Sequence, residues 1–308
     1  AGLAEPAAAT EELLRQDLRS KLFYLEGILW LYRHGYDGAL EHAYRATKAL
    51  EDVLGATDAA LHLLELARQL GLPEPVLQWC ETQASLTKTE VAEQLTQHWL
   101  PLPDGTIPIF RSICATLVAL DFEGYARDRR SLMREIRSWL RKLEHTSLDM
   151  YVLQGNHGLH ELRRQLRWLP IIAVSLDGLV ITNDEHNPIK DYRALLTSKV
   201  AASPYARLPE PIREDKPIAI SKSVFLAAID LIARLGELKD RGEDLAGLEH
   251  ALIGGGAAKT SRAARARALE LLGRTPDQLM ADQRQAERIY RGLKRNRFFK
   301  VLRSDFEG

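Results

Sequence analysis

The sequence predicts an all-α protein, and three observations support this fold class. Leu, Ala, Arg and Glu dominate the 308-residue chain, whereas alternating runs of β-branched residues are scarce. Apolar residues recur every three or four positions, as in the run from Leu18 to Leu29. A short motif also occurs twice, which indicates a duplicated helical unit. We therefore expect two pseudo-symmetric helical bundles, over residues 10–150 and 155–300, packed around a basic central groove.

Local signals divide the first half of the chain into helices. Thr10 followed by two glutamates is a typical helix start, and Gly71-Leu72-Pro73 is a typical end. Glycines at positions 55 and 124 allow breaks, and residues 101–105 are rich in turn formers and should be a loop. The helices of this half are expected at 10–34, 36–70, 74–84, 86–99 and 109–144.

The second half is expected to open with a helix that begins at Gly158 and ends or kinks at Pro170, although residues 171–174 are apolar enough to continue it beyond the proline. Five prolines between 183 and 217 predict a long connection holding one short helix at 189–199. Gly254-Gly255-Gly256 is interpreted as a flexible link. The remaining elements are a strand-compatible run at 179–182 and helices at 221–240, 245–252, 260–272 and 276–299.

The repeated motif is an apolar helix followed by Leu-Gly and then an aspartate. The first copy is Leu54-Gly55-Ala56-Thr57-Asp58, and the second is Leu235-Gly236-Glu237-Leu238-Lys239-Asp240. Two arginines four positions apart precede each copy: Arg15 and Arg19 in the first half, Arg163 and Arg167 in the second. Because the order is the same in both halves, we infer a duplication that brings the basic helices toward a shared groove.

The helix around residues 158–169 combines a cationic face with an apolar stripe. Residues three, four and seven apart share a helix face, so four side chains should project together: His160, Arg163, Arg164 and Arg167. This arrangement is typical of an anion site, and an ordinary basic surface helix is the alternative. If His160 contacts the anion, binding should strengthen as the pH falls through its pKa. A packed or capping histidine is the other interpretation.

Two further helices carry rows of arginines, which we call arginine ladders. The first ladder consists of Arg127, Arg130, Arg134, Arg137 and Arg141, and the second of Arg284, Arg288, Arg291 and Arg295. Apolar side chains occupy the other side of the first helix: Leu132, Met133, Ile136, Trp139, Leu140 and Leu143.

Something must offset the repulsion between like charges this close together, which costs a few tenths of a kcal/mol per pair. The acidic neighbours Asp128, Glu135 and Glu144 are one candidate. A bound polyanion is the other, because guanidinium groups bind phosphate oxygens in a bidentate manner.

A helix of the form His-x-x-Arg-x-x-x-Arg, a later Leu-Gly-Glu-Leu-x-Asp helix, and the doubling of both resemble the CHAD family, the conserved histidine α-helical domain. The resemblance implies a pair of four-helix bundles whose basic central groove binds inorganic polyphosphate without catalysis. It also implies that His160, Arg163 and Arg167 are ligand residues, with Arg15 and Arg19 as first-half equivalents. The sequence departs from the family at Glu12, which stands where a second histidine is expected.

Composition limits the other function classes. The 42 basic residues balance the 42 acidic ones, so no whole-molecule field steers the chain toward nucleic acid or membranes, although members of the family are typically basic. Cys80 and Cys114 lack metal-ligand spacing, and no run of 18 apolar residues occurs. We therefore expect a cytoplasmic soluble protein without a cofactor.

No motif for catalysis or metal binding stands out. The two histidines His157 and His160, next to Glu161, have no third metal ligand at motif spacing. Residues 254–260 lack the glycine spacing of a phosphate-binding loop. The expected function is non-catalytic binding of inorganic polyphosphate or a similar polyanion. The alternative is a helical scaffold for protein or nucleic-acid binding, with nucleic acid the less favoured partner.

Overall fold

The computed structural model confirms the all-α class. It describes residues 6–16, 18–33, 38, 40–120, 124–145, 156–183, 198–203, 206–211 and 217–306. The chain divides into two compact units: residues 1–121 with 243–276 form unit 1, and residues 122–242 with 277–308 form unit 2. This division differs from a cut near residue 150, because the chain enters unit 2 at residue 122 and returns to unit 1 at residue 243.

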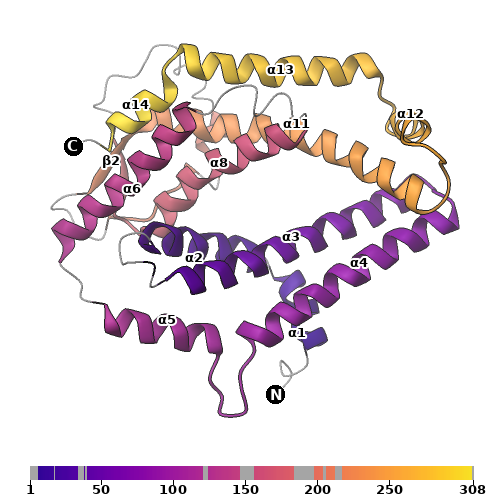
Figure 1. Ribbon diagram of the computed structural model, residues 1–308. Helices are drawn as coiled ribbons and strands as arrows, with labels where there is room; N and C mark the ends of the chain where they lie inside the picture. The colour runs from indigo at the N-terminus through magenta and orange to yellow at the C-terminus, as the bar shows by residue number, and fades with distance from the viewer. Residues whose placement is uncertain are drawn as a thin grey trace. The chain divides into compact units, whose positions relative to one another are not determined.

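Unit 1 is built on a long helical hairpin. Helices α3 (Glu41–Gln69) and α4 (Glu74–Gln94) lie side by side, as Figure 1 shows. Gly71 ends α3 with a φ of 61°, and the Leu72 amide donates to the Ala67 carbonyl at 3.1 Å, as expected for a glycine C-cap. The other elements are α1 (Pro6–Arg15), α2 (Leu18–Arg33), the π-helix η1 (Leu95–Trp99), α5 (Pro108–Ala119) and α12 (Ser261–Leu271).

Two apolar clusters hold unit 1 together. One joins α1 to η1 through Leu22, Leu50 and Val91, and the other joins α2, α3 and α5 through Leu29 and Ile109. The apolar side chains that recur every three or four positions are therefore buried between the helices, as predicted. The first predicted helix is nevertheless two helices, α1 and α2, so Arg15 and Arg19 lie on different elements.

Unit 2 contains a small parallel sheet among helices. Strand β1 (Val180–Asn183) pairs with β2 (Ile218–Ser221), with Val180 opposite Ile218. The Ser221 amide donates to the Asp305 carboxylate at 2.9 Å, which ties the end of the chain to β2. The helices of this unit are α6 (Tyr125–His145), α8 (Asn156–Ser175), α10 (Ser198–Ala201), α13 (Pro276–Arg295), α14 (Phe298–Ser304) and the first part of α11 (Lys222–Gly254).

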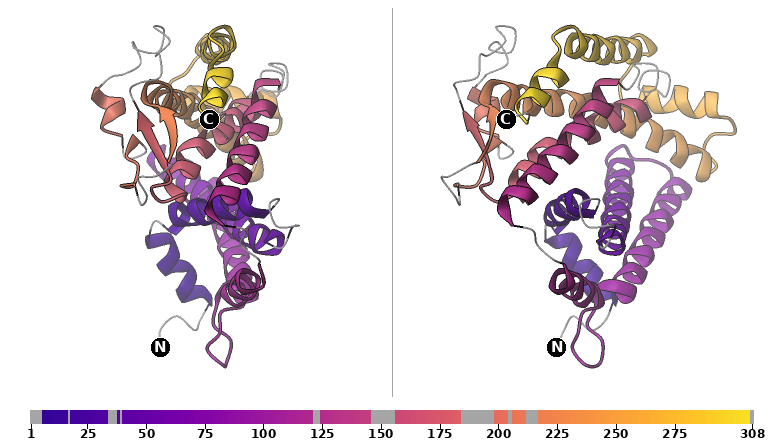
Figure 2. Two further views of the ribbon diagram at one scale, coloured as in Figure 1. Left: turned by 90° about the vertical axis from the view of Figure 1, so that its left-hand side faces the viewer. Right: turned by 60° about the vertical axis from the view of Figure 1, so that its left-hand side comes forward.

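Ion pairs and hydrogen bonds link the helices of unit 2 to one another. Helix α14 lies against α6, as Figures 1 and 2 show, and Arg303 pairs with Glu144 at 2.6 Å. The Trp139 indole donates to Gln165 at 3.1 Å and so links α6 to α8. Arg241 binds the Asp282 carboxylate through two nitrogens, at 3.0 and 3.2 Å, and links α11 to α13.

Several predicted boundaries differ from the structure. Helix α8 continues past Pro170 to Ser175, the alternative that the apolar residues after the proline had left open, and residues 171–173 are buried. Helix α3 passes through Gly55 unbroken, and α11 is one helix where two were predicted. The predicted short helix at 189–199 falls largely outside the described residues.

The glycine run at 254–256 is not the flexible link that we predicted. Gly254 ends α11, and a Cβ at position 255 would lie only 2.5 Å from the Val76 Cα. Gly256 has a φ of 72°, which favours glycine. The run therefore packs the end of α11 tightly against α4 within unit 1.

Candidate functional site

Helix α8 has the two faces that its sequence predicts. Leu162, Leu166 and Leu169 are at most 2% exposed and form the apolar face. Arg163 and Arg167 are half-buried and Arg164 is exposed, on the other side of the helix. His160 belongs to α8, but its side chain lies outside the described residues.

The two neighbouring arginines of α8 make different contacts. Arg163 reaches α11, where its Nε donates to the Ile232 carbonyl at 3.3 Å. A Cβ on Gly236 would lie 3.0 Å from this Nε, so the absence of a side chain at Gly236 lets the guanidinium pack closely against α11. Arg164 instead pairs with Glu161 on its own helix, at 3.1 Å. Arg163 is therefore the better placed of the two to present a cation at a helix junction.

A cavity of about 180 Å³ lies beside Arg163 in unit 2. Arg163 and Arg167 line it from α8, together with Ser203. The other described residues that line it are apolar: Pro170, Ile171, Ile229, Ile232 and Ala233. Sequence reasoning missed Ser203 and the residues of α11, because no local spacing connects them to the arginines.

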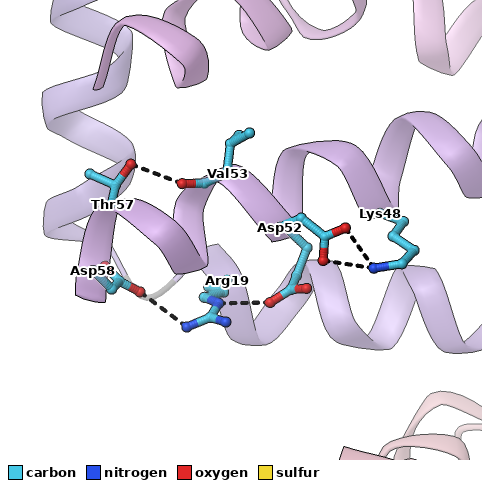
Figure 3. Close-up of polar contacts among 7 residues, drawn as sticks. Arg19, Lys48, Asp52, Val53, Thr57 and Asp58 are labelled. Atoms are coloured by element: carbon cyan, nitrogen blue, oxygen red, sulfur yellow. Dashed lines mark hydrogen bonds and ion pairs between the residues drawn. The ribbon is translucent and has the colours of Figure 1, made fainter. Parts of the chain in front are cut away.

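Unit 1 holds an equivalent contact around Arg19. A Cβ on Gly55 would lie 2.8 Å from the Arg19 Cζ, so this guanidinium also rests on a glycine of the facing helix. Two carboxylates of α3 neutralise it: Glu51 at 2.8 Å and Asp58 at 3.3 Å. Figure 3 shows Arg19 along α3 beside Asp58, with the Lys48–Asp52 ion pair nearby.

These contacts match Arg19 to Arg163, since each arginine lies over the glycine of a Leu-Gly motif. The two Arg-x3-Arg spacings would instead match Arg15 to Arg163, one helical turn away. Gln16 lies three residues before Arg19, as His160 lies three residues before Arg163, whereas Glu12 lies three residues before Arg15. Arg15 itself is 72% exposed and pairs with Glu12 at 2.7 Å. A polyanion at either first-half arginine would have to displace a carboxylate.

The first arginine ladder lies on the outer side of α6. The six predicted apolar side chains of α6 are buried, at most 6% exposed. Arg127, Arg130, Arg134 and Arg141 are exposed, and Arg137 is half-buried with its Nε on the Met133 carbonyl at 3.2 Å. The predicted separation into a basic and an apolar side is therefore confirmed.

Three arginines of this ladder have no acidic partner among the described residues. Arg130, Arg134 and Arg141 form no ion pair with any residue that the structure describes. Glu144, one of the three carboxylates considered for that role, binds Arg303 instead. Three guanidinium groups on one helix face are thus left to solvent or to a ligand.

The second ladder, on α13, has the same character. Arg284, Arg288 and Arg295 are exposed and make no ion pair within the described part of the chain. Arg291 pairs with Glu287. Tyr290 and Leu293 are buried on the other side of α13, at 2% and 4% exposure. Among the residues described, six arginines on α6 and α13 thus have no carboxylate partner.

Unit 1 contains a histidine pair that sequence reasoning did not single out. His42 of α3 and His98 of η1 stack edge to face, with ring centroids 5.8 Å apart. Burial lowers the pKa of His98, and the charge of His42 lowers it further. Across the residues described, no group of three or more His, Cys, Asp or Glu side chains could hold a metal ion.

The outer face of α5 is apolar. Phe110, Leu117 and Val118 are 49%, 41% and 88% exposed, and Cys114 is exposed among them. Cys80 is buried in α4, where burial raises the pKa of its thiol. No helix in the described ranges is long and apolar enough to span a membrane.

Comparisons with known proteins find no relative. The chain matches no family model, and searches of curated proteins and of solved structures return no significant match.

Proposed function

We propose that the chain binds inorganic polyphosphate, without catalysis, through the arginines of unit 2. One observation carries this proposal: exposed arginines recur at helical spacing and lack carboxylate partners. On α6 and α13 they are Arg130, Arg134, Arg141, Arg284, Arg288 and Arg295.

The physical reason lies in the spacing. Side chains three or four residues apart on a helix are about 5–6 Å apart, which concentrates positive charge along one line. A chain of linked phosphates offers negative charge at regular intervals and lets each planar guanidinium bind oxygens bidentately. A bound polyanion would therefore remove the repulsion within each ladder.

We also propose that the chain is a CHAD-like domain built of two similar helical bundles. The Arg–Gly contacts at Gly55 and Gly236 support this duplication. Because Glu51 and Asp58 already form ion pairs with Arg19, we assign the anion-binding role to unit 2. His160 would add charge to that site at low pH.

The test is calorimetry with long-chain polyphosphate over a series of salt concentrations. Binding should weaken with salt, because each neutralised phosphate releases counterions. Changing Arg130, Arg134 and Arg141 together to Gln should lower the slope of log K against log salt by about 2, as three contacts to a single strand predict.

A second triple variant provides the matched control. Arg45, Arg68 and Arg267 also face solvent, but each pairs with a glutamate. Changing these three to Gln alters the net charge by the same amount and should leave the salt slope nearly unchanged. Equal effects of the two triple variants, or no salt-sensitive binding near about 100 mM salt, would contradict the proposal.

The alternative function is a scaffold for a protein or a nucleic acid. The exposed apolar face of α5 favours a protein partner, while the ladders would also suit nucleic-acid phosphates. Competition separates the nucleic-acid case: DNA at equal phosphate concentration should displace a polyphosphate tracer poorly if the ladders are specific for polyphosphate. Equal displacement of the tracer by DNA and by polyphosphate would favour the nucleic-acid hypothesis.

A further inference from the structure

The two arginine ladders repeat one spacing on two different helices of unit 2 (Figure 1). On each helix, four arginines lie at relative positions 0, 4, 7 and 11, beginning at Arg130 on α6 and at Arg284 on α13. The third arginine of each set is engaged within its own helix: Arg137 donates to a backbone carbonyl, and Arg291 pairs with Glu287. The pattern that remains on both helices is 0, 4 and 11.

The arginines at these three positions form a straight line along each helix. All of them are exposed, and none has an acidic partner among the described residues. An α-helix turns by about 100° and rises about 1.5 Å per residue, so the three positions differ in direction by at most about 40°. The line is therefore about 16 Å long at the backbone. We call the two sets the guanidinium lines: Arg130, Arg134 and Arg141 on α6, and Arg284, Arg288 and Arg295 on α13.

The packing of both helices keeps these lines at the surface. On α6, Ile136 and Leu140 are completely buried, and on α13, Tyr290 and Leu293 are at most 4% exposed. Neither helix can turn about its axis without bringing its apolar side into water, so the arginines stay outward. Because the two lines lie on different helices and share no residue, each can bind an anion independently of the other.

A line of this length selects for the shape of the anion. A compact phosphate reaches one or two of the guanidinium groups, whereas an extended chain of linked phosphates can reach all three. Successive phosphorus atoms in such a chain are about 3 Å apart, so roughly six phosphates span one line, with a guanidinium bound to oxygens at both ends. Triphosphate covers only the closest pair of a line, such as Arg130 and Arg134, which are about 6 Å apart along the axis.

We propose that each guanidinium line is a separate site for a stretch of about six linked phosphates, so that one protein chain binds two short polyphosphates and selects them by length. This inference rests on the proposed function, because the same arginines bind the ligand. It adds the minimum length of the ligand and the number of sites, neither of which the proposed function specifies.

Calorimetry on the full chain compares two ligands of the same chemistry. Polyphosphate of about seven units should bind at two sites per chain, and at least about tenfold tighter than triphosphate, because it reaches the third arginine of each line. Triphosphate that binds as tightly as the longer ligand would overturn the inference. A single site for the longer ligand would overturn it as well.

Two triple variants assign the sites. Changing the three arginines of the α6 line to Gln should leave one site, with an affinity within about twofold of the control, and the α13 triple variant should likewise leave the other. Combining both sets should remove tight binding. The control is the triple variant at Arg45, Arg68 and Arg267, which loses the same charge and should keep both sites. Because all of these side chains are exposed, thermal melts should differ little among the variants.

The remaining outcomes separate this inference from the proposed function. If one triple variant abolishes both sites, the two lines act as one site and the inference is wrong. Long-chain polyphosphate is titrated in parallel over the salt series. If it binds in a salt-sensitive manner while the shorter polyphosphate shows one site or no advantage over triphosphate, only this inference fails. If long-chain polyphosphate shows no salt-sensitive binding, the proposed function itself fails.

Discussion

Gly255→Ala should destabilise unit 1, because a methyl group there meets backbone that cannot rotate away. The new Cβ would lie 2.5 Å from the Val76 Cα and 2.8 Å from its amide nitrogen. Ordinary Cβ contacts begin at 3.4 Å, so α4 and the end of α11 would have to separate by roughly 1 Å. Overpacking of this kind costs about 1–3 kcal/mol.

A smaller term opposes this cost. Alanine restricts the unfolded chain more than glycine does, which stabilises by about 0.4–1 kcal/mol where the backbone tolerates it. The net loss should be about 1–2 kcal/mol, which corresponds to a fall in Tm of roughly 2–8 °C for a domain of 150–250 residues. Circular dichroism melts and urea titrations at fixed protein concentration measure both quantities.

Gly292→Ala is the matched control. Gly292 lies inside α13, and a Cβ there meets nothing within 4 Å. This variant should be stabilised by up to about 1 kcal/mol through helix propensity alone. If Gly255→Ala proves as stable as Gly292→Ala, the close approach of α4 and α11 is refuted.

Three further predictions concern unit 1. Glu51→Gln should release Arg19 from its shortest ion pair and so raise the number of phosphates that the chain binds at low salt, measured by calorimetry; an unchanged stoichiometry would contradict this. Cys114 should react with a thiol reagent at once and Cys80 only on unfolding, since burial raises the pKa of the Cys80 thiol and blocks access. Burial lowers the pKa of His98, so the unfolded state binds a proton at this residue at a higher pH than the folded state does. The free energy of unfolding should therefore fall as the pH drops from about 6.5 toward the lowered pKa. His98→Gln should reduce this loss of Tm at acid pH, measured by thermal melts.

Local patterns predicted the parts of the fold that local physics determines. The two sides of α6 follow from residue spacing alone, because side chains three and four apart share a face. The end of α3 follows from Gly71, whose positive φ suits glycine. The same spacing rule arranged the ladders correctly on α6 and α13.

Features that depend on distant contacts were not predictable. The glycines at 254 and 255 resemble a flexible link until α4 is placed against them, and then each accommodates a close neighbour. The cavity joins α8, Ser203 and α11, which no motif connects. The division into units also depends on residues 243–276 returning to unit 1, a fact of packing that hydrophobic periodicity does not encode.

The two Arg–Gly contacts lie at unequal distances along the sequence, which affects how the proposed duplication can be recognised. Arg19 and Gly55 are 36 positions apart, whereas Arg163 and Gly236 are 73 positions apart. On the proposed duplication, one copy has about 37 residues more than the other between these landmarks, and β1 and β2 lie within that interval. Such a repeat has no constant period, so methods that look for one will miss it. On the same proposal, a guanidinium packed on a helix glycine marks the two copies better than a sequence period does.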